Sequence, residues 1–392
     1  MASRRPPNRK AMIRDTAAEL FLEHGYHNVS VTDVAGALDI TASALYHHYR
    51  NKQDLLLHAV LAGLDTVAAR IRAADNLDEA LRGLAALVTG PRSVLAVWER
   101  EARNLDGTQR DAIREREAVV VSSFVPLLRA ERPELGEPDA AFVARAVLGA
   151  LGSRSRHRIT LPRRRHEELL VRVGASVALC PVPQNDGAPA NHHAPALGTG
   201  AVLRIPRREQ LLTEAIRLFD ERGYQSVTMA DIGEAAGIVA SGVYRHFPSK
   251  TDLLIAAVNR GGERVRAAAE TALAQASDTR EALELLLRAH VTVCMEQVHL
   301  IGILANERDQ LPEKERTALR RVQADYLDVW VQALRAVLPG RDTPELKIMI
   351  HAVHGMIYFV VRSEGARHRT DLPERLTSLG LAVLLGDGVP HG

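Results

Sequence analysis

The sequence predicts an all-α protein built from two tandem copies of one helical unit. Apolar residues recur at helical spacing along most of the 392 residues, and aromatic residues, which strands favour, make up only 4%. The segment that begins at Phe21 recurs from Phe219, with about 18 of 40 positions identical. Beyond Glu101 the repeat continues at a spacing of 206 residues instead of 198, so the second copy carries a net eight extra residues before this point.

The repeat divides the chain into five predicted segments. These are a first head over 1–55, a first body over 56–180, a linker over 181–203, a second head over 204–253 and a second body over 254–392. Proline, glycine and small residues without apolar periodicity predict the linker. It contains His192 and His193, but no Cys, Asp or Glu stands at ligand spacing, so a linker is a better interpretation than a metal site.

Composition excludes several classes of protein. Hydrophobic residues make up 46% and charged residues 25%, which is ordinary for a globular chain, and the net charge is only +2. There is no apolar run of membrane-spanning length and no secretory signal, and two cysteines, Cys180 and Cys294, are too few for a disulfide framework. No phosphate loop, Gly-x-Ser-x-Gly or His-Glu-x-x-His motif occurs. We therefore expect a cytoplasmic protein that is not an enzyme and needs no metal or cofactor.

The first head is predicted to contain a helix-turn-helix. An amphipathic helix over Arg9–His24 ends at Gly25, Thr32 caps a short helix that ends at Leu38, and Thr41 caps a third helix over Thr41–Tyr49. A longer helix opens at Lys52. Two short helices joined by a tight turn are typical of DNA-binding motifs in which the second helix enters the major groove.

The candidate DNA-contacting side chains lie on this motif and on its copy. Hydroxyl, imidazole and guanidinium groups suit phosphates and base edges, and small residues let the helix lie deep in the groove. The candidates are Thr32, Thr41, Ala42, Ser43, Ala44, Tyr46, His47 and Lys52 in the first head and Thr228, Val239, Ala240, Ser241, Gly242, Tyr244, Arg245, His246 and Lys250 in the second.

Some positions of the heads allow a second interpretation, and others differ between the two copies. Packing within the head is the alternative to phosphate contact for Tyr46 and Tyr244. Val239 stands where the first copy has Thr41 and cannot cap its helix, and Gly237 replaces Asp39 at a turn that often needs positive φ. Basic arms precede the heads and could reach phosphates, although a solvated run of charge would look the same: Arg4, Arg5, Arg9 and Lys10, then Arg204, Arg207 and Arg208.

The segments Ile40–Leu56 and Ile238–Leu254 resemble the DNA-binding domain of TetR-family transcriptional regulators, as do Phe21–Tyr26 and Phe219–Tyr224. The resemblance implies a three-helix head that binds a double-stranded DNA operator. It also implies a helical body that binds a small-molecule effector and dimerises through its last two helices. The tandem arrangement departs from the usual single unit, so the two heads are expected to pair within one chain as a pseudo-dimer, or two chains to form a homodimer.

The bodies contain candidate effector-binding residues, each of which could equally be ordinary helix core. They are Trp98, Arg103 and Phe124 in the first body and Cys294, His299, Tyr326, Trp330, His354, Met356 and Tyr358 in the second. The stretch from Asn306 to Arg316 is similar to a TetR subgroup that senses acyl-CoA thioesters, so the expected effector is a small apolar molecule such as an acyl-CoA.

The sequence supports two functions. The first is a ligand-responsive repressor whose two heads bind an imperfect palindrome, because the recognition segments of the heads differ. The alternative is a ligand- or partner-binding scaffold that has lost specific DNA binding, which the missing cap at Val239 and the low net charge favour.

Overall fold

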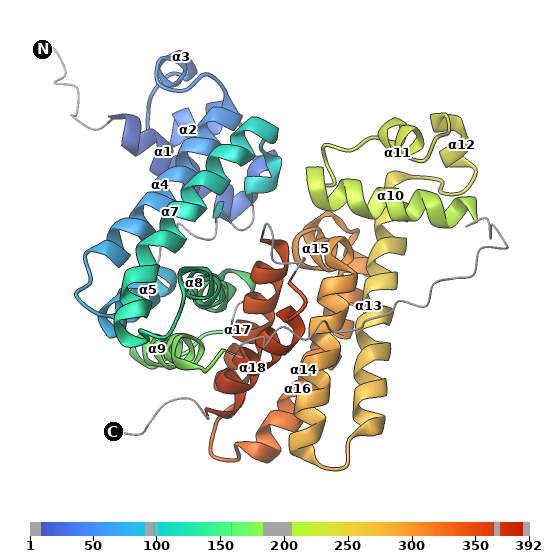
Figure 1. The fold of residues 1–392 in the computed structure, drawn as a ribbon. Helices are drawn as coiled ribbons and strands as arrows, with labels where there is room; N and C mark the ends of the chain where they lie inside the picture. Colours follow the sequence, from blue (N-terminus) through green and yellow to red (C-terminus); the bar gives the residue numbers. More distant parts are fainter. Residues whose placement is uncertain are drawn as a thin grey trace, which may run out of the picture. The chain divides into compact units, whose positions relative to one another are not determined.

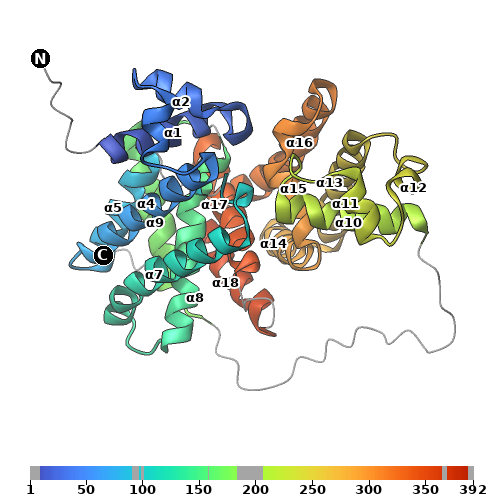
Figure 2. The ribbon, with the colours of Figure 1, turned by 90° about the horizontal axis from the view of Figure 1, so that it is seen from above.

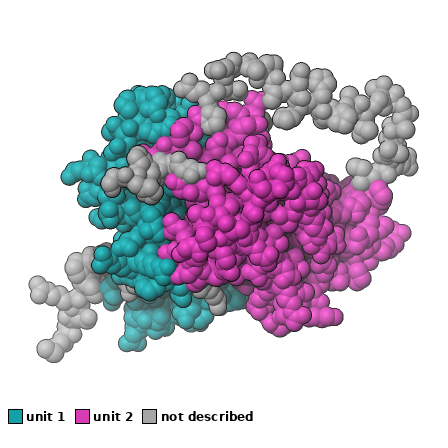
Figure 3. All heavy atoms as spheres, turned by 90° about the horizontal axis from the view of Figure 1, so that it is seen from below, with its two compact units in different colours: residues 1–178 teal, residues 179–392 magenta. Residues whose placement is uncertain are grey.

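The computed structural model describes residues 9–90, 97–98, 101–157, 159–182, 206–363 and 369–386. All regular secondary structure in these ranges is helical, which confirms the all-α prediction. The chain divides into two compact units, Met1–Ala178 and Leu179–Gly392 (Figure 3). The predicted His192, His193, Arg4, Arg5 and Arg204 lie outside the described residues, as does most of the predicted linker.

Unit 1 begins with a helix of 16 residues, continues through three short elements and then into longer helices (Figure 1). Its helices are α1 (Arg9–His24), η1 (Tyr26–Asn28), α2 (Val31–Ala37), α3 (Ala42–Tyr46), α4 (Lys52–Arg72), α5 (Leu77–Thr89), η2 (Ala102–Asn104), α7 (Gly107–Glu131), α8 (Glu137–Gly152), η3 (Ser153–Arg156) and α9 (Arg163–Leu179).

Unit 2 repeats this order, and Figure 2 shows its α10, α11 and α12 gathered at one end of α13. Its helices are α10 (Arg207–Arg222), α11 (Met229–Ala235), α12 (Ala240–Tyr244), α13 (Lys250–Gln275), α14 (Thr279–Glu296), α15 (Val298–Asn306), η4 (Arg308–Gln310), α16 (Glu313–Val337), α17 (Thr343–Arg362) and α18 (Leu372–Leu385).

The first helix of each head ends as the sequence predicts. Gly25 and Gly223 follow α1 and α10 with φ of 82° and 77°, a conformation that glycine adopts without a Cβ penalty. Phe21 and Phe219, one turn earlier, are fully buried and lie 5.3 and 5.2 Å from the rings of Tyr26 and Tyr224. The buried aromatic pair then directs the chain toward the helix-turn-helix in both copies.

A single long helix joins each head to its body. The predicted boundaries at 55/56 and 253/254 fall inside α4 and α13, so the head and the body share a continuous helix. The second of these helices has 26 residues and the first has 21, which accounts for much of the extra length of the second copy. A rigid connection of this kind transmits movement of the body to the head.

The bodies repeat the same internal packing. A Cβ on Gly174 of α9 would come within 2.7 Å of Leu81, and a Cβ on Gly380 of α18 would come equally close to Leu287. Glycine therefore lets the last helix approach α5 in one copy and α14 in the other. None of the described helices combines the length and the apolar character needed to cross a membrane.

Candidate DNA-binding heads and effector-binding bodies

The recognition helix of the first head is α3. Thr41 caps it as predicted, because the Ala44 amide donates to Thr41 Oγ1 at 3.2 Å. Leu45 points into the core and is fully buried, whereas Tyr46 is 53% exposed. Thr41, Ser43 and His47 are also exposed. The helix ends at Tyr46 instead of Tyr49, and its exposed face carries the predicted hydroxyl and imidazole groups.

The predicted cap at Thr32 is wrong. Ser30 caps α2, accepting from the Asp33 amide at 3.1 Å, while the Asp33 carboxylate accepts from the Ser30 amide at 2.7 Å. Thr32 lies one residue inside the helix and is exposed. The spacing of 198 residues pairs Ser30 with Thr228, which caps α11 in the same reciprocal way. The repeat therefore contained the signal that would have identified the correct cap.

The second head keeps the scaffold and changes the surface. Val239 lies at the N-cap of α12 with no side-chain hydrogen bond, as expected, and is 71% exposed. Tyr244 is 53% exposed, equal to its counterpart Tyr46. Arg245 and His246 are exposed, as are Ser241 and Thr228, while Ala240 is half-buried.

Gly242 is a candidate that faces the protein instead of the groove. It is buried, and a Cβ there would come within 3.0 Å of the Ile238 side chain. Ala44 at the matching position of α3 is only half-buried, as is Ala42. The turns before the two recognition helices share the expected positive φ although their residues differ: Asp39 has φ of 52° and Gly237 has φ of 69°.

The lysine at the start of the fourth helix is a predicted phosphate contact, and in the second head its side chain is engaged within the head. The Lys250 ammonium donates to the carbonyl oxygens of Tyr224 and Val227, both at 2.9 Å, and lies 4.3 Å from the centre of the Tyr224 ring. Burial lowers its pKa. Lys52 similarly lies 4.2 Å over Tyr26. A long flexible side chain has turned back to hold the segment between the first two helices, a direction that no sequence spacing specifies.

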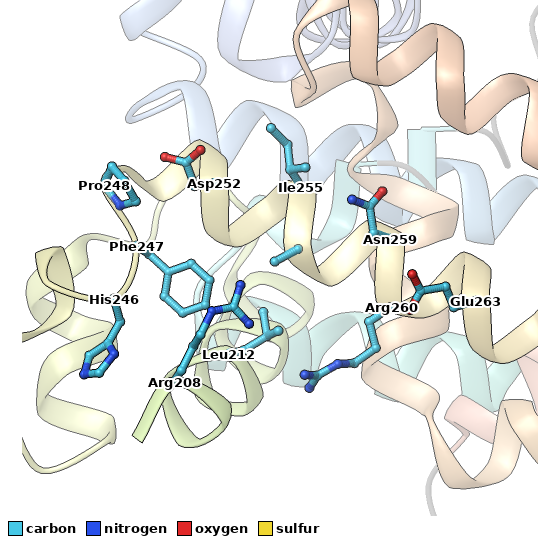
Figure 4. Close-up of a pocket in the computed structure, with 11 residues that line it drawn as sticks. Arg208, Leu212, His246, Phe247, Pro248, Asp252, Ile255, Asn259, Arg260 and Glu263 are labelled. Carbon is cyan, nitrogen blue, oxygen red and sulfur yellow. The ribbon is translucent and has the colours of Figure 1, made fainter. Parts of the chain in front are cut away.

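A groove lies beside the recognition helix of the second head, between α10 and α13. Its volume is about 490 Å³, and the Arg208 guanidinium lies 4.6 Å over the Phe247 ring that lines it (Figure 4). Ala256 lies on its α13 side. In the first head the matching positions hold larger polar rings, Tyr49 and His58, whose centres are 5.3 Å apart. The second head therefore has a groove at positions where the first head carries bulkier side chains.

Arg207, predicted to reach phosphate, is instead engaged within the head. Its guanidinium donates to Gln210 at 2.7 Å and to the Ala236 carbonyl at 3.1 Å. These bonds tie the start of α10 to the end of α11. Of the second basic arm, Arg208 keeps an exposed side chain beside the groove.

Buried polar contacts join the second head to its body. Asp220 on α10 has a side chain only 2% exposed, and both its oxygens accept from Arg362 Nη1 on α17, at 2.9 and 2.8 Å. His299 Nδ1 on α15 lies 2.8 Å from the same carboxylate, and Gly302 leaves the space that it occupies. The first copy has Leu22 in place of Asp220.

A second link between head and body is common to both copies. The Tyr224 amide donates to the buried Glu307 carboxylate at 3.2 Å. Glu101 occupies the corresponding position of the first copy, is also buried, and accepts from Asn104 at 2.9 Å. The acid therefore holds the second head directly, whereas in the first copy the link to the head runs through Asn104, whose Oδ1 lies 3.0 Å from His27 Nε2.

In the first body two of the three candidate residues have different roles, and the side chain of the third, Arg103, lies outside the described part of the structure. The Trp98 indole donates to Glu117 at 2.7 Å. Burial raises the pKa of Glu117 to about 7, although the hydrogen bond from Trp98 acts in the opposite sense. Phe124 is fully buried and packs as core. A carboxyl with a pKa near neutrality inside a helical body is a candidate ligand-contacting group.

In the second body the candidates come together. Tyr326 and Trp330 on α16 meet His354 on α17, and the structure adds His290 on α14, which the sequence reasoning missed. We call His290, Tyr326, Trp330 and His354 the ring cluster. The signal for His290 was its position one helical turn before Cys294, whose Sγ lies 3.5 Å from His290 Nε2.

The remaining second-body candidates lie along the path from the ring cluster to the head. Tyr358 is one turn beyond His354, and its hydroxyl accepts from Asn306 at 2.8 Å. Arg362 lies one turn further, 5.2 Å over the Tyr358 ring. Met356 is fully buried. No group of three His, Cys, Asp or Glu side chains in the described part of the chain is placed to hold a metal ion.

The family model of the bacterial regulatory proteins of the tetR family matches the chain twice, at residues 13–59 and 211–257. Both matches cover the helix-turn-helix and the start of the long helix that follows it. In the described helices of the two matched segments, the N-cap, the buried aromatic pair and the exposed tyrosine of one copy each have a counterpart in the other.

Several characterised or solved proteins are similar to the chain. The HTH-type transcriptional repressor KstR2 of Rhodococcus jostii is 29% identical over 33% of this chain and 64% of its own length. The repressor KstR of the same organism is 25% identical over 46% of this chain and 84% of its own. The solved ketosteroid transcriptional regulator KstR2 of Mycobacterium tuberculosis is 21% identical, with a TM-score of 0.41, over 48% of this chain and 98% of its own.

Proposed function

The chain is a tandem member of the tetR family of bacterial regulatory proteins, and from this we propose that it is a ligand-responsive transcriptional regulator that binds operator DNA with both heads. We further propose that it represses, as the names of the similar KstR and KstR2 state for those proteins. It would act in the cytoplasm, where its operator lies.

The observation that carries the proposal is the pair of matched recognition surfaces. Tyr46 and Tyr244 are large side chains that remain 53% exposed, each on the face of a short helix whose opposite side is fully buried through Leu45 or Val243. Such exposure costs hydrophobic free energy unless the surface has a partner. Exposed hydroxyl groups at Ser43 and Ser241 beside each tyrosine suit phosphate oxygens and base edges.

The two heads are proposed to read unequal half-sites. His47 in the first head is replaced by Arg245 in the second, and arginine pairs bidentately with guanine where histidine does not. Thr41 is likewise replaced by Val239, which offers a thymine methyl contact in place of a hydroxyl. An operator that is an imperfect palindrome follows from these differences, with the heads paired within one chain or between two chains.

Effector binding in a body is proposed to release the DNA. A ligand shifts the equilibrium only if it changes contacts that differ between two conformations. The Asp220–Arg362 ion pair and the bond from Tyr224 to Glu307 are contacts of this kind, because each joins an element of the head to one of the body. An effector with an apolar part, such as the acyl chain of an acyl-CoA, remains our proposal for the ligand.

The test is a gel-shift assay on an operator obtained by selection with the purified full chain. Tyr46→Ala and Tyr244→Ala should each weaken binding by roughly tenfold, in line with the loss of one or two interface contacts. Val119→Ala, which truncates an exposed side chain on α7 of the first body, is the matched control and should bind normally. Unchanged helicity in circular dichroism would show that all three variants fold.

Salt dependence separates the proposal from the scaffold alternative. A DNA-binding pair of heads loses affinity steeply as salt concentration rises, because phosphate contacts release counterions. A log–log slope near zero, or normal binding by both tyrosine variants, would contradict DNA recognition by these heads.

A further inference from the structure

We propose that the ring cluster of the second body binds the uncharged, oxygen-bearing end of an otherwise apolar small molecule. This rests on the proposed function in one respect, namely that the second body receives an effector. It goes further by assigning the residues that bind the polar group of that effector and the charge that this group must have.

The geometry brings four rings from three helices into mutual contact. The His290 and His354 rings stack with centres 4.1 Å apart, and the Trp330 ring meets His354 edge-on at 5.0 Å. His290 Nδ1 lies 2.9 Å from the Tyr326 hydroxyl. Tyr326 and His354 are half-buried although they lie between α14, α16 and α17, so part of each side chain remains exposed.

Two polar atoms of the cluster have no hydrogen-bond partner. They are the Trp330 indole nitrogen and His354 Nε2, both inaccessible to water and without a partner at hydrogen-bond distance among the described residues; the Trp330 indole acts on the Tyr326 hydroxyl only enough to offset part of the rise in its pKa that burial causes. An indole N–H is always a donor, and an imidazole nitrogen donates or accepts according to its tautomer. Native proteins rarely leave such groups unpaired, because desolvation without a hydrogen bond is costly. One ligand oxygen placed between them would accept from Trp330 and pair with His354.

The matching positions of the first body show that packing does not require these polar groups. At the spacing of 206 residues, Val120, Phe124 and Leu148 stand where the second body has Tyr326, Trp330 and His354. All three are buried and apolar. These three positions of the first body therefore pack without polar atoms, and the polar atoms at the matching positions of the second body serve something besides packing.

The cluster carries no charge with which to neutralise a charged ligand group. Burial lowers the pKa of His290 to about 4 and that of His354 well below its usual value, so both imidazoles are neutral near pH 7. Burial raises the pKa of the Cys294 thiol to about 12. A carboxylate or ammonium group would enter without a counter-charge and lose its hydration, whereas a ketone or hydroxyl oxygen loses little.

The test is isothermal titration calorimetry of the full chain with two matched probes, 2-decanone and decanoate, at pH 8. We expect saturable binding of the ketone and at least tenfold weaker binding of the carboxylate. Trp330→Phe and His354→Phe keep an aromatic ring while removing the polar atom, and each should weaken ketone binding by roughly three- to tenfold. Val119→Ala, at an exposed residue of α7 in the first body, is the control and should leave ketone binding unchanged.

Three results would overturn the inference: no saturable ketone binding, decanoate binding as tight as that of the ketone, or unchanged ketone binding in both ring variants. A gel shift without any probe tests the proposed function separately. Normal operator binding together with absent ketone binding would reject the ring cluster as a ligand site and leave DNA recognition standing. Saturable ketone binding without operator binding would do the reverse.

Discussion

The N-cap residues of the two recognition helices can be exchanged by two reciprocal substitutions. Thr41 and Val239 precede α3 and α12 with nearly identical backbone angles, φ and ψ of −77° and 151° against −74° and 152°. A threonine at 239 would therefore be placed to cap without moving the chain. Both side chains are exposed, so neither substitution disturbs buried packing. Thr41→Val should destabilise α3, and Val239→Thr should stabilise α12.

The structure makes the two effects unequal. Losing a threonine cap costs about 1 kcal/mol, because the amide that it served loses its partner. In the uncapped α12 the Gly242 amide has already found the Val239 carbonyl, at 2.8 Å. A threonine hydroxyl at 239 would give the Gly242 amide a better acceptor than the carbonyl it already uses. We therefore expect α12 to be stabilised by about 0.5 kcal/mol, the low end of the range for caps.

Hydrogen exchange of the full chain measures both effects locally. Amides of α3 should exchange roughly fivefold faster in Thr41→Val, and amides of α12 roughly twofold slower in Val239→Thr. Thr41→Ser keeps the oxygen and should leave the rate nearly unchanged. If Val239→Thr instead accelerated exchange, or Thr41→Val left it unaltered, the cap would not be what holds these helices and the reasoning would fail.

Two further perturbations test the interiors of the units by urea unfolding. Asp220→Leu should destabilise unit 2 by about 3 kcal/mol, since it leaves the partly buried Arg362 without a carboxylate, and adding Arg362→Leu should recover most of this loss. Trp330 fluorescence in a Trp98→Phe chain reports on unit 2 alone, and a double variant no more stable than the single one would argue against the ion pair. Because the folded-state pKa of Glu117 is raised from 4.5 to about 7, the free energy of unfolding should fall as pH rises through this range, by at most about 3 kcal/mol. Glu117→Gln should abolish that fall, and an equal fall in the variant would assign it to another group.

The sequence predicted helix type and order well because apolar periodicity and terminal signals act locally. The helix α1 begins and ends where Arg9–His24 was expected, its counterpart α10 covers Arg207–Arg222, and each is followed by a glycine in the required conformation. Side-chain direction was less predictable. Lys250 carries the charge of a phosphate contact, yet its ammonium is held by backbone carbonyls of its own head. The spacing of residues along the chain does not show whether a lysine contacts a phosphate or the backbone of its own head.

The same limit applied to the head–body contacts. Asp220 lies on the amphipathic α10 among residues that read as solvent-facing, and its partners Arg362 and His299 are more than 75 residues away in the sequence. No local pattern links them. Comparison of the copies would have identified Asp220. Leu22 at the equivalent position indicates that this side of the helix faces the protein in the first copy, so a carboxylate there in the second copy needs a partner.

Duplication makes the two bodies controls for one another. The residue pair at Trp98 and Glu117 recurs as Leu304 and Gln323, and both pairs are hydrogen-bonded: the indole donates to the carboxylate at 2.7 Å, and the glutamine amide to the Leu304 carbonyl at 3.4 Å. The two copies thus make a hydrogen bond between the same pair of positions, but the donor moves from the first residue of the pair to the second and the carboxylate is lost. A position that is polar in one copy and apolar in the other, inside an otherwise common core, is therefore better evidence for a ligand than burial or aromatic character alone. By this criterion the rings of the second body are the stronger candidate, because their counterparts Val120, Phe124 and Leu148 are apolar whereas Glu117 has the polar counterpart Gln323.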